Sequence, residues 1–221
     1  MASTADGNTA DANTVDANDG AAPRIGVLAL QGAFDAHVVM LRRLGVEAVF
    51  VRTPGQLRLV DALIFPGGES TTMSMLLESS GLFEAIASRL SEGMPAFGTC
   101  AGLILLAREV LDGRADQRFF TAIDVVARRN GYGRQIDSFE EAVAVVGLDG
   151  LKFPVVFIRA PVVESVGDGV EVLALLGGHA ALCRQGNVLV AAFHPELTED
   201  VRIHQMFLHS VIAHLASTKQ L

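Results

Sequence analysis

The chain has 221 residues, half of them apolar, and a formal net charge of −8 at neutral pH. That length accommodates one large domain or two small ones, with enough apolar residues for a substantial core. The apolar runs are short and broken by glycine, proline and charged residues, so none reaches membrane-spanning length. The absence of a basic stripe argues against a nucleic-acid partner. Two cysteines do not make a disulfide framework and indicate a reducing cytoplasm.

Residues 1–22 differ in composition from the rest of the chain. They are rich in Ala, Asp, Asn and Thr and contain no Lys or Arg. Such a stretch cannot bury enough apolar surface to offset the entropy lost on ordering, so we predict a disordered acidic tail over 1–22. It lacks the basic start and apolar centre of a signal peptide. Residues 23–221 contain no linker or internal repeat and are expected to form a single domain.

The first half of the chain alternates between strand and helix patterns. Apolar runs typical of buried strands occupy residues 24–30, 46–51 and 62–65, and a fourth ends at Phe97. Helical spacing occupies residues 33–44, a stretch from about Ser70, residues 82–91, and residues 101 to about 111, with a short turn at 57–60. This alternation predicts an α/β fold, in which a parallel sheet has helices on both faces.

The second half is predicted to contain shorter strands separated by glycine-rich turns. The expected strands occupy residues 123–127, 143–146, 155–158, 170–176, 180–184 and 188–193, with loops at 112–119 and 128–135. Tight turns at 177–178 and 185–187 predict a partly antiparallel arrangement. The chain closes with an amphipathic helix over 200–215 that turns Ile203, Phe207, Val211 and Leu215 inward.

Residues 98–102, Gly-Thr-Cys-Ala-Gly, stand between a short apolar strand and an apolar helix. This is the cysteine form of the strand–turn–helix nucleophile elbow, whose small residues permit a tight turn that presents the nucleophile. Cys100 would sit at the N-terminus of a helix, where unpaired N–H groups favour a negative charge. The alternative is a buried structural cysteine, since free cysteines are often buried.

A histidine and a carboxylate follow another apolar strand, in the sequence His194-Pro195-Glu196. Proline keeps the preceding residue extended, and residues two apart in an extended chain point the same way. Glu196 can therefore orient the imidazole and stabilise its protonated form, while His194 acts as general base toward Cys100. The alternative is a histidine that ends a strand, with Glu196 solvated. Beside a cysteine elbow, the pair favours acyl-transfer chemistry.

Acyl transfer needs N–H groups that hold the oxyanion of the tetrahedral intermediate. Ala101, directly after the nucleophile, is one expected donor. Gly68, in the sequence PGGES at 66–70, is the second, because glycine lets the backbone approach a substrate closely. PGGES also fits a turn followed by a helix capped by Ser70, and the two interpretations are compatible.

The remaining cysteine and histidines lack the spacing of a metal site. They are Cys183, His37, His179, His204, His209 and His214. We expect Cys183 in the core of a strand, and the three histidines of the last helix on its surface. Neither a metal nor a cofactor is expected.

The sequence resembles the class I, or triad, glutamine amidotransferases, and among them the glutaminase subunits of two-component pyridoxal 5′-phosphate synthases. The resemblance rests on IGVLALQGAFDAH, IFPGGESTTM, PAFGTCAGLILLA, RRNGYGRQIDSFE, VFIRAP and FHPELTED, between Ile25 and Asp200. The acidic N-terminal stretch and the loop at 112–121 depart from the family's pattern. The resemblance implies a three-layer, flavodoxin-like fold with a mostly parallel central sheet and a partly antiparallel extension.

The resemblance further implies that the domain is a glutaminase, which hydrolyses L-glutamine to glutamate and ammonia. Cys100 would be the nucleophile, and His194 and Glu196 would complete the triad. The residues expected to contact glutamine are Gly68, Glu69, Ser70, Arg129, Ile158 and Arg159. A guanidinium suits the substrate's carboxylate and Glu69 suits its ammonium group, and either arginine fits the first role.

The implied partner is a synthase subunit, a barrel protein that forms a hetero-oligomer with the glutaminase. It would combine the ammonia with a pentose phosphate and a triose phosphate, so pyridoxal phosphate is a product and not a cofactor. Because a free glutaminase would waste glutamine, we expect docking to complete the oxyanion hole, with Gln31 and Gly32 near the contact. Both follow the first strand, at the sheet edge expected to carry the active site.

Three other interpretations stay open on sequence alone. The same glutaminase chemistry serves synthases for histidine, purines or anthranilate. A DJ-1-like redox or chaperone protein also places a cysteine in an elbow, but gives His194 and Glu196 no role. A non-catalytic assembly subunit would retain the triad residues without using them.

Overall fold

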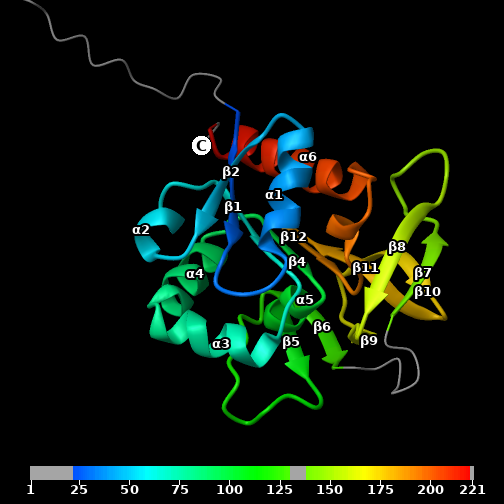
Figure 1. Ribbon diagram of the computed structural model, residues 1–221, viewed down its shortest axis with the longest axis horizontal. Coiled ribbons are helices and arrows are strands. Elements are labelled where there is room, and N and C mark those ends of the chain that lie inside the picture. The colour runs from blue at the N-terminus through cyan, green and yellow to red at the C-terminus, as the bar shows by residue number, and fades with distance from the viewer. Residues whose placement is uncertain (1–21, 130–137, 220–221) are drawn as a thin grey trace, which may run out of the picture.

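The computed structural model describes residues 22–129 and 138–219. Neighbouring parallel strands form one side of its main sheet (Figure 1). In spatial order from the edge they are β2 (Glu47–Val51), β1 (Arg24–Leu28), β3 (Ala62–Phe65), β4 (Ala96–Thr99) and β12 (Val188–Ala191). Parallel strands have their carboxyl ends at one edge, so the segments that follow β1, β3, β4 and β12 meet there.

Beyond β12 the sheet becomes mostly antiparallel. In spatial order the added strands are β11 (His179–Gln185), β9 (Val162–Val166), β6 (Ile123–Arg128) and β5 (Ala107–Val110), with β10 (Glu171–Leu176) beside β11. A separate antiparallel hairpin of β7 (Ser138–Val143) and β8 (Phe153–Ile158) stands at the right of Figure 1. The predicted parallel sheet with a partly antiparallel extension is thus confirmed.

Helices cover both faces of this sheet, as Figure 1 shows. They are α1 (Phe34–Arg43), α2 (Pro54–Leu57), α3 (Ser70–Ser79), α4 (Leu82–Ser91), α5 (Ala101–Leu106) and α6 (Arg202–Thr218), and a 3-10 helix spans Pro195–Leu197. Phe97 of β4 packs toward α1 and α6, edge-on to the rings of His37 and His204. Its neighbour Gly98 faces the other way, against Gly102 of α5. Among the helices that the structure describes, none has the length and apolarity needed to cross a bilayer.

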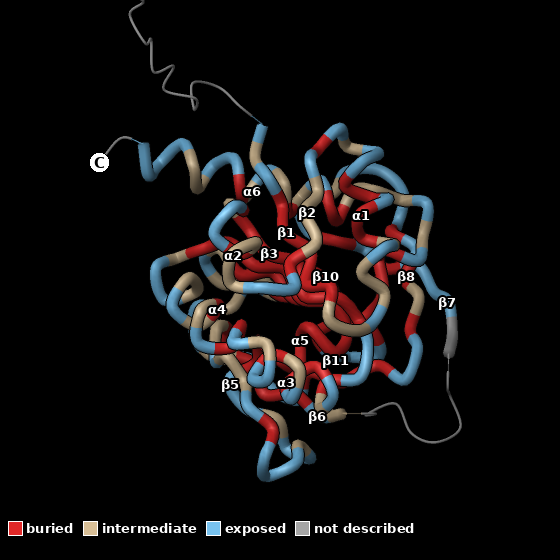
Figure 2. Tube along the Cα trace, turned by 60° about the vertical axis from the view of Figure 1, so that its left-hand side comes forward, coloured by how far each residue is buried: buried red, intermediate tan, exposed pale blue. Residues whose placement is uncertain are grey.

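The core follows the strands, and Figure 2 shows the buried residues gathered along them. Its largest fully buried side chains include Phe65, Phe97, Phe193 and Phe207. Burying one such side chain contributes about 1.5–3 kcal/mol to stability. The loops at the carboxyl edge are therefore held on a tightly packed scaffold.

The predicted strands and helices of the first half are confirmed, except for the helix of the elbow. The sequence predicts that this helix reaches about residue 111, whereas α5 ends at Leu106 and residues 107–110 form β5. The carbonyls of Leu105 and Leu106 accept the N–H groups of Phe120 and Ala122, both at 2.8 Å. A neighbouring segment thus takes the acceptors that a longer helix would need.

In the second half, the predicted strand at 143–146 is wrong. β7 ends at Val143, and the N–H of Val146 instead donates to the carbonyl of Leu173 at 2.8 Å, before Gly147 turns the chain with a φ of 82°. Strand β9 was not predicted, because only its first two residues form an apolar pair before Glu164. The predicted tail at 1–22 and loop at 128–135 lie almost wholly outside the described residues.

The glycines of the elbow permit a test of how tightly this turn is packed. A Cβ atom on Gly102 would overlap the carbonyl oxygen of Phe65, which is backbone and cannot rotate away. We therefore expect Gly102→Ala to lower the free energy of unfolding by about 1–3 kcal/mol or more. Gly55→Ala in α2 is the control, because its nearest neighbours would be 3.7 Å away. Equal stability of the two variants in urea unfolding would contradict the tight turn.

Candidate active site

Cys100 lies between β4 and α5, at the carboxyl edge of the sheet. Its backbone has a φ of 50° and a ψ of −101°, a conformation that few residues other than glycine adopt. The N–H of Cys100 donates to the carbonyl of Ala191 at 2.9 Å, which ties the turn to the end of β12. The structure thus has the strained strand–turn–helix geometry of a nucleophile elbow, with a small part of the cysteine exposed.

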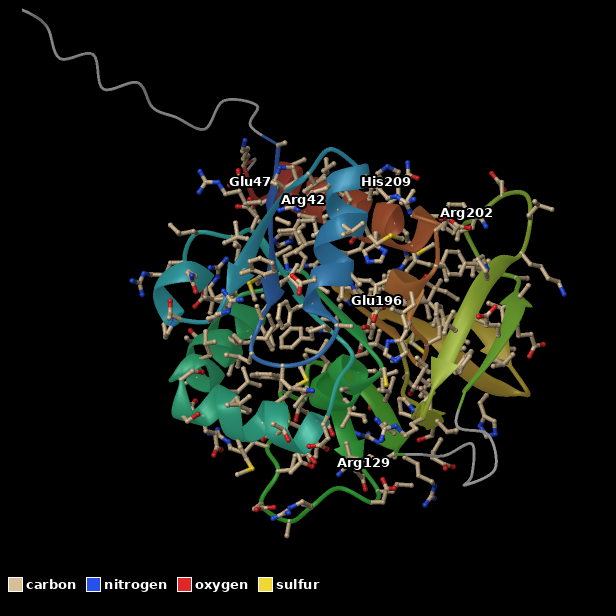
Figure 3. The ribbon with its side chains drawn as sticks, in the orientation of Figure 1. Arg42, Glu47, Arg129, Glu196, Arg202 and His209 are labelled. Carbon is tan, nitrogen blue, oxygen red and sulfur yellow. The ribbon has the colours of Figure 1, made fainter. Side chains whose placement is uncertain are left out.

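His194 follows β12 and lines the same pocket as Cys100, and interaction with the Cys100 side chain is one of the causes that raise the pKa of this histidine. The Nδ1 atom of His194 lies 2.7 Å from Oε1 of Glu196, in the 3-10 helix. Figure 3 shows Glu196 in the interior, near the end of α1, and only 5% of this residue is exposed. The carboxylate occupies one ring nitrogen and leaves the other for the sulfur, so the structure brings the predicted triad together.

The surroundings of the triad favour an imidazolium beside an ionised carboxylate. Burial lowers the pKa of His194, but hydrogen bonds with Cys100 and Glu196 together outweigh burial and raise this pKa to about 10. Burial raises the pKa of Glu196, but interactions with His37 and His194 outweigh burial, so the pKa falls below its usual value.

Two glycine-containing loops close around the imidazole. Gly67 follows β3, and a Cβ atom there would overlap the ring of His194. Gly32 follows β1 with a φ of 100°, and a Cβ atom there would overlap the carbonyl oxygen of Gly67. The neighbouring Gln31 accepts the N–H of Glu69 through its Oε1 atom at 2.8 Å. The loop after β1 therefore supports the loop after β3, which carries the predicted oxyanion donor.

A pocket of about 370 Å³ opens beside Cys100, within the size range of small-molecule sites. The predicted site residues that line it are Gln31, Gly32, Gly68, Glu69, Ser70, Cys100, Ala101, Arg129, Ile158, Arg159 and His194. Glu196 is the predicted residue that does not line it, because it lies behind His194. Ile104 and Leu197 also line the pocket. They were not predicted from the sequence, because an apolar side chain gives no local sign that it lies at a binding site.

Glu69 and Arg129 form an ion pair at the pocket, with Nη2 of Arg129 2.9 Å from Oε1 of Glu69. Arg129 comes from the end of β6, at the lower side of Figure 3, and also donates to Thr71 at 3.2 Å. Burial raises the pKa of Glu69, but hydrogen bonds from Thr72 and Thr71 outweigh burial and lower this pKa to about 2. The pocket therefore presents a fixed negative and a fixed positive group side by side.

The prediction that Ser70 caps α3 is wrong. Glu69 is the N-cap, because its longer side chain reaches the N–H groups of Thr71 and Thr72 at 3.1 and 2.7 Å. The Ser70 hydroxyl is buried and has no hydrogen-bond partner among the described residues. Ser70 nevertheless belongs to the lining of the pocket.

Comparison with known proteins identifies the family of this fold and pocket. A family model described as the SNO glutamine amidotransferase family matches residues 27–213. The chain belongs to this family. The match runs from β1 into α6, so it includes every element that carries the site. The resemblance inferred from the sequence is confirmed.

Curated relatives of this SNO family chain carry a common name. The Salinispora arenicola protein, pyridoxal 5′-phosphate synthase subunit PdxT, is 53% identical over 197 residues, which cover 87% of this chain and 98% of the relative. The Mycobacterium avium protein of the same name is 54% identical over 194 residues, which cover 86% and 98%.

Solved structures agree on the fold. One described as a glutamine amidotransferase has a TM-score of 0.80 at 49% identity and covers 85% of this chain and 98% of its own. A putative GMP synthase subunit from Thermoplasma acidophilum, at 17% identity, has a TM-score of 0.64 with coverage of 91% and 100%. The second shows a shared fold alone.

Behind the triad of this SNO family chain lie two histidines that the sequence analysis left without a role. The prediction that His204 lies on the surface of α6 is wrong, because its side chain is fully buried with Nε2 3.0 Å from Nδ1 of His37. Burial lowers the pKa of both residues, that of His204 to about 3. The position of His204 between Ile203 and Phe207, on the apolar face of α6, is the signal that indicates burial.

The structure agrees with the predictions for His209 and Cys183, whereas His214 is half-buried, with its Nδ1 atom 3.0 Å from Nδ2 of Asn187. His209 is exposed on α6, and Cys183 is fully buried in β11, where burial raises its pKa to about 11. Within the described residues, no group of three or more His, Cys, Asp or Glu side chains is arranged to hold a metal ion.

The two buried histidines predict how stability depends on pH. The pKa values of both histidines in the folded chain lie below the unfolded value of about 6.5. Below that pH the unfolded chain therefore binds more protons than the folded chain, and stability decreases as the pH is lowered. Replacing His204 with Phe removes one such group. We expect the stability loss between pH 6.5 and 5 to shrink by about 1 kcal/mol per pH unit, measured by urea unfolding.

His209→Gln is the matched control for this experiment. His209 lies on the same helix but is exposed, so its replacement should leave the slope unchanged. An identical slope in wild type and His204→Phe would contradict a neutral, buried His204.

Proposed function

We propose that this glutamine amidotransferase hydrolyses L-glutamine to glutamate and ammonia and supplies the ammonia for synthesis of pyridoxal 5′-phosphate. The observation that carries the proposal is the continuous Cys100–His194–Glu196 arrangement beside a pocket. The family membership and the name shared by relatives about half identical to the chain support the substrate and the pathway.

In the proposed mechanism, the Cys100 thiolate attacks the carbon of the substrate's side-chain amide. The tetrahedral intermediate collapses as His194, protonated and held by Glu196, donates a proton to the departing nitrogen. Ammonia leaves and a thioester to Cys100 remains. Water then attacks the thioester with His194 as general base, which releases glutamate and restores the thiol.

The oxyanion of the intermediate is assigned to the backbone N–H groups of Gly68 and Ala101. Ala101 is the first residue of α5, and the first N–H groups of a helix have no acceptor within the helix. Gly68 lines the same pocket from the loop after β3. A donor of this kind contributes about 10²–10³-fold to turnover in acyl-transfer enzymes.

The amino-acid end of glutamine is assigned to the polar part of the pocket. Glu69 suits the ammonium group and Arg129, already fixed beside it, suits the carboxylate. The unpartnered hydroxyl of Ser70 and the backbone of Gly68 are further contacts, as are Ile158 and Arg159. Arg129 is favoured over Arg159 for the carboxylate because its ion pair and its bond to Thr71 hold the guanidinium in place.

A pair of cysteine variants tests the proposed chemistry. Cys100→Ala removes the nucleophile and should abolish glutaminase activity, whereas Cys183→Ala alters a buried cysteine outside the pocket and should retain it. Glu196→Gln keeps the shape of the carboxylate but not its charge, so we expect kcat to fall by about 10⁴-fold. Release of glutamate and ammonia from glutamine is the measurement. Activity in Cys100→Ala near the wild-type level would refute the mechanism.

The proposed partner is a synthase subunit that receives the ammonia in a hetero-oligomer in the cytoplasm. The curated relatives are themselves named as subunits of a synthase. Gln31 and Gly32 are proposed to lie near the contact, and Gln31 bonds to the N–H of Glu69, next to the oxyanion donor Gly68. Docking at this loop would therefore act directly on the oxyanion hole. Residues 23–221 are proposed to act as one glutaminase domain, preceded by a disordered tail.

If docking completes the oxyanion hole, the rate of glutamine hydrolysis should depend on the presence of the synthase subunit. Adding the proposed synthase partner should raise kcat for glutamine at least about tenfold, because one well-placed oxyanion donor is worth that much or more. An unrelated barrel protein is the control and should have no effect. Equal turnover with and without the synthase would contradict a docking-dependent oxyanion hole.

A further inference from the structure

A line of buried polar side chains continues from the triad into the interior. Thr99, the last residue of β4, lies with its Oγ1 atom 3.5 Å from Oε1 of Glu196 and 3.2 Å from Nε2 of His37. The same Nε2 atom lies 3.6 Å from Oε2 of Glu196. Nδ1 of His37 is 3.0 Å from Nε2 of His204. All four residues are buried, and the line joins β4, α1, α6 and the 3-10 helix.

The ionised carboxylate determines where the protons of this line sit. A carboxylate can only accept, so the Nε2 atom of His37 that faces Glu196 carries the proton. Nδ1 of neutral His37 is then an acceptor, and it receives the Nε2 proton of His204. The remaining ring nitrogen of His204 has no partner among the described residues, which fits an unprotonated atom in apolar surroundings.

We propose that His37 is a positioning residue of the glutaminase, which presents an N–H group to the rear of Glu196 and so holds that carboxylate ionised and aimed at His194. The proposal rests on the function proposed above, because it assigns His37 a role in the same triad. His204 acts one step further back, by fixing the orientation of the His37 ring.

The reason is the cost of a charge in the interior. A carboxylate as buried as Glu196 is stable only with donors around it, and Oε2 has no hydrogen-bond partner within the described residues. The Nε2 atom of His37 lies 3.6 Å from this oxygen and 3.2 Å from Oγ1 of Thr99, whose hydroxyl in turn donates to Oε1 of Glu196 at 3.5 Å. Hydrogen bonds to a charged group are stronger than those between neutral groups, so donors on this side of Glu196 favour its ionised form.

The titratable groups around this line come from several elements. Facing His37 are Glu196 from the 3-10 helix, His194 from the end of β12, and His204 from α6. Cys100, at the start of α5, faces His194 from the pocket side. Any change at His37 therefore reaches the thiol through Glu196 and His194 in turn.

A purely structural role for His37 is the competing explanation, since the ring also packs against Phe97. Two substitutions separate the roles. His37→Leu keeps an apolar side chain on α1 but removes the N–H. His37→Gln keeps an N–H donor at a similar reach, although a buried Gln disturbs packing at least as much as Leu does. A packing role thus predicts that Gln is no better than Leu, and a positioning role predicts that Gln restores function.

The experiment is a titration of His194 by ¹⁵N NMR in the full-length chain, with its signals identified by their loss in His194→Asn. We expect His37→Leu to lower the pH at which His194 loses its proton by about one unit from its value near 10. His37→Gln should recover at least half of that shift. In glutaminase assays with the synthase present, kcat should fall about tenfold in His37→Leu while KM stays unchanged.

Phe207→Leu is the matched control, because it disturbs the packing of α6 on Phe97 without touching the triad. It should lower stability and leave the His194 midpoint where it is. An unchanged midpoint in His37→Leu, or equal shifts in His37→Leu and His37→Gln, would overturn the proposal. A wild-type chain that never hydrolyses glutamine would instead overturn the proposed function, and the NMR comparison would still decide whether His37 acts on Glu196 and His194.

Discussion

The site depends on one buried carboxylate. Glu196 lies behind the imidazole of His194, almost out of contact with water, and interactions with His37 and His194 outweigh burial and keep its pKa below the usual value. The negative charge of Glu196 in turn raises the pKa of His194. The sheet supplies the geometry, because β4 and β12 are parallel neighbours whose carboxyl ends bring the cysteine and the histidine together.

The backbone around this charge leaves little freedom. The N–H of Cys100 is bonded across to the end of β12, and Gly67 lies against the His194 ring. Gly32 in turn lies against the carbonyl of Gly67. The loops that follow β1, β3, β4 and β12 are therefore in contact, so a displacement of the loop after β1 is transmitted through Gly67 to His194. This contact makes control by a partner at the rim physically reasonable.

Much of this arrangement could be predicted from the sequence, because local patterns encode it. The elbow glycines, the apolar strand before His194 and the alternation of strands and helices are all signals within a few residues of each other. The errors have a different origin. The end of α5 depends on N–H groups of Phe120 and Ala122, and the cap of α3 depends on the rotamer of Glu69. The burial of His204 depends on α1 packing beside α6. Each of these is decided by contacts between distant segments.

The contrast among the buried histidines shows how the fold directs a proton. Interactions with Cys100 and Glu196 outweigh burial at His194 and raise its pKa, whereas burial outweighs the attraction of Glu196 at His37 and His204 and lowers theirs. The same residue type thus has opposite charge states within one short line of contacts. Burial lowers the pKa values of His37 and His204, so a proton is held on His194 in preference to the two histidines behind Glu196. The proton is therefore kept beside the pocket.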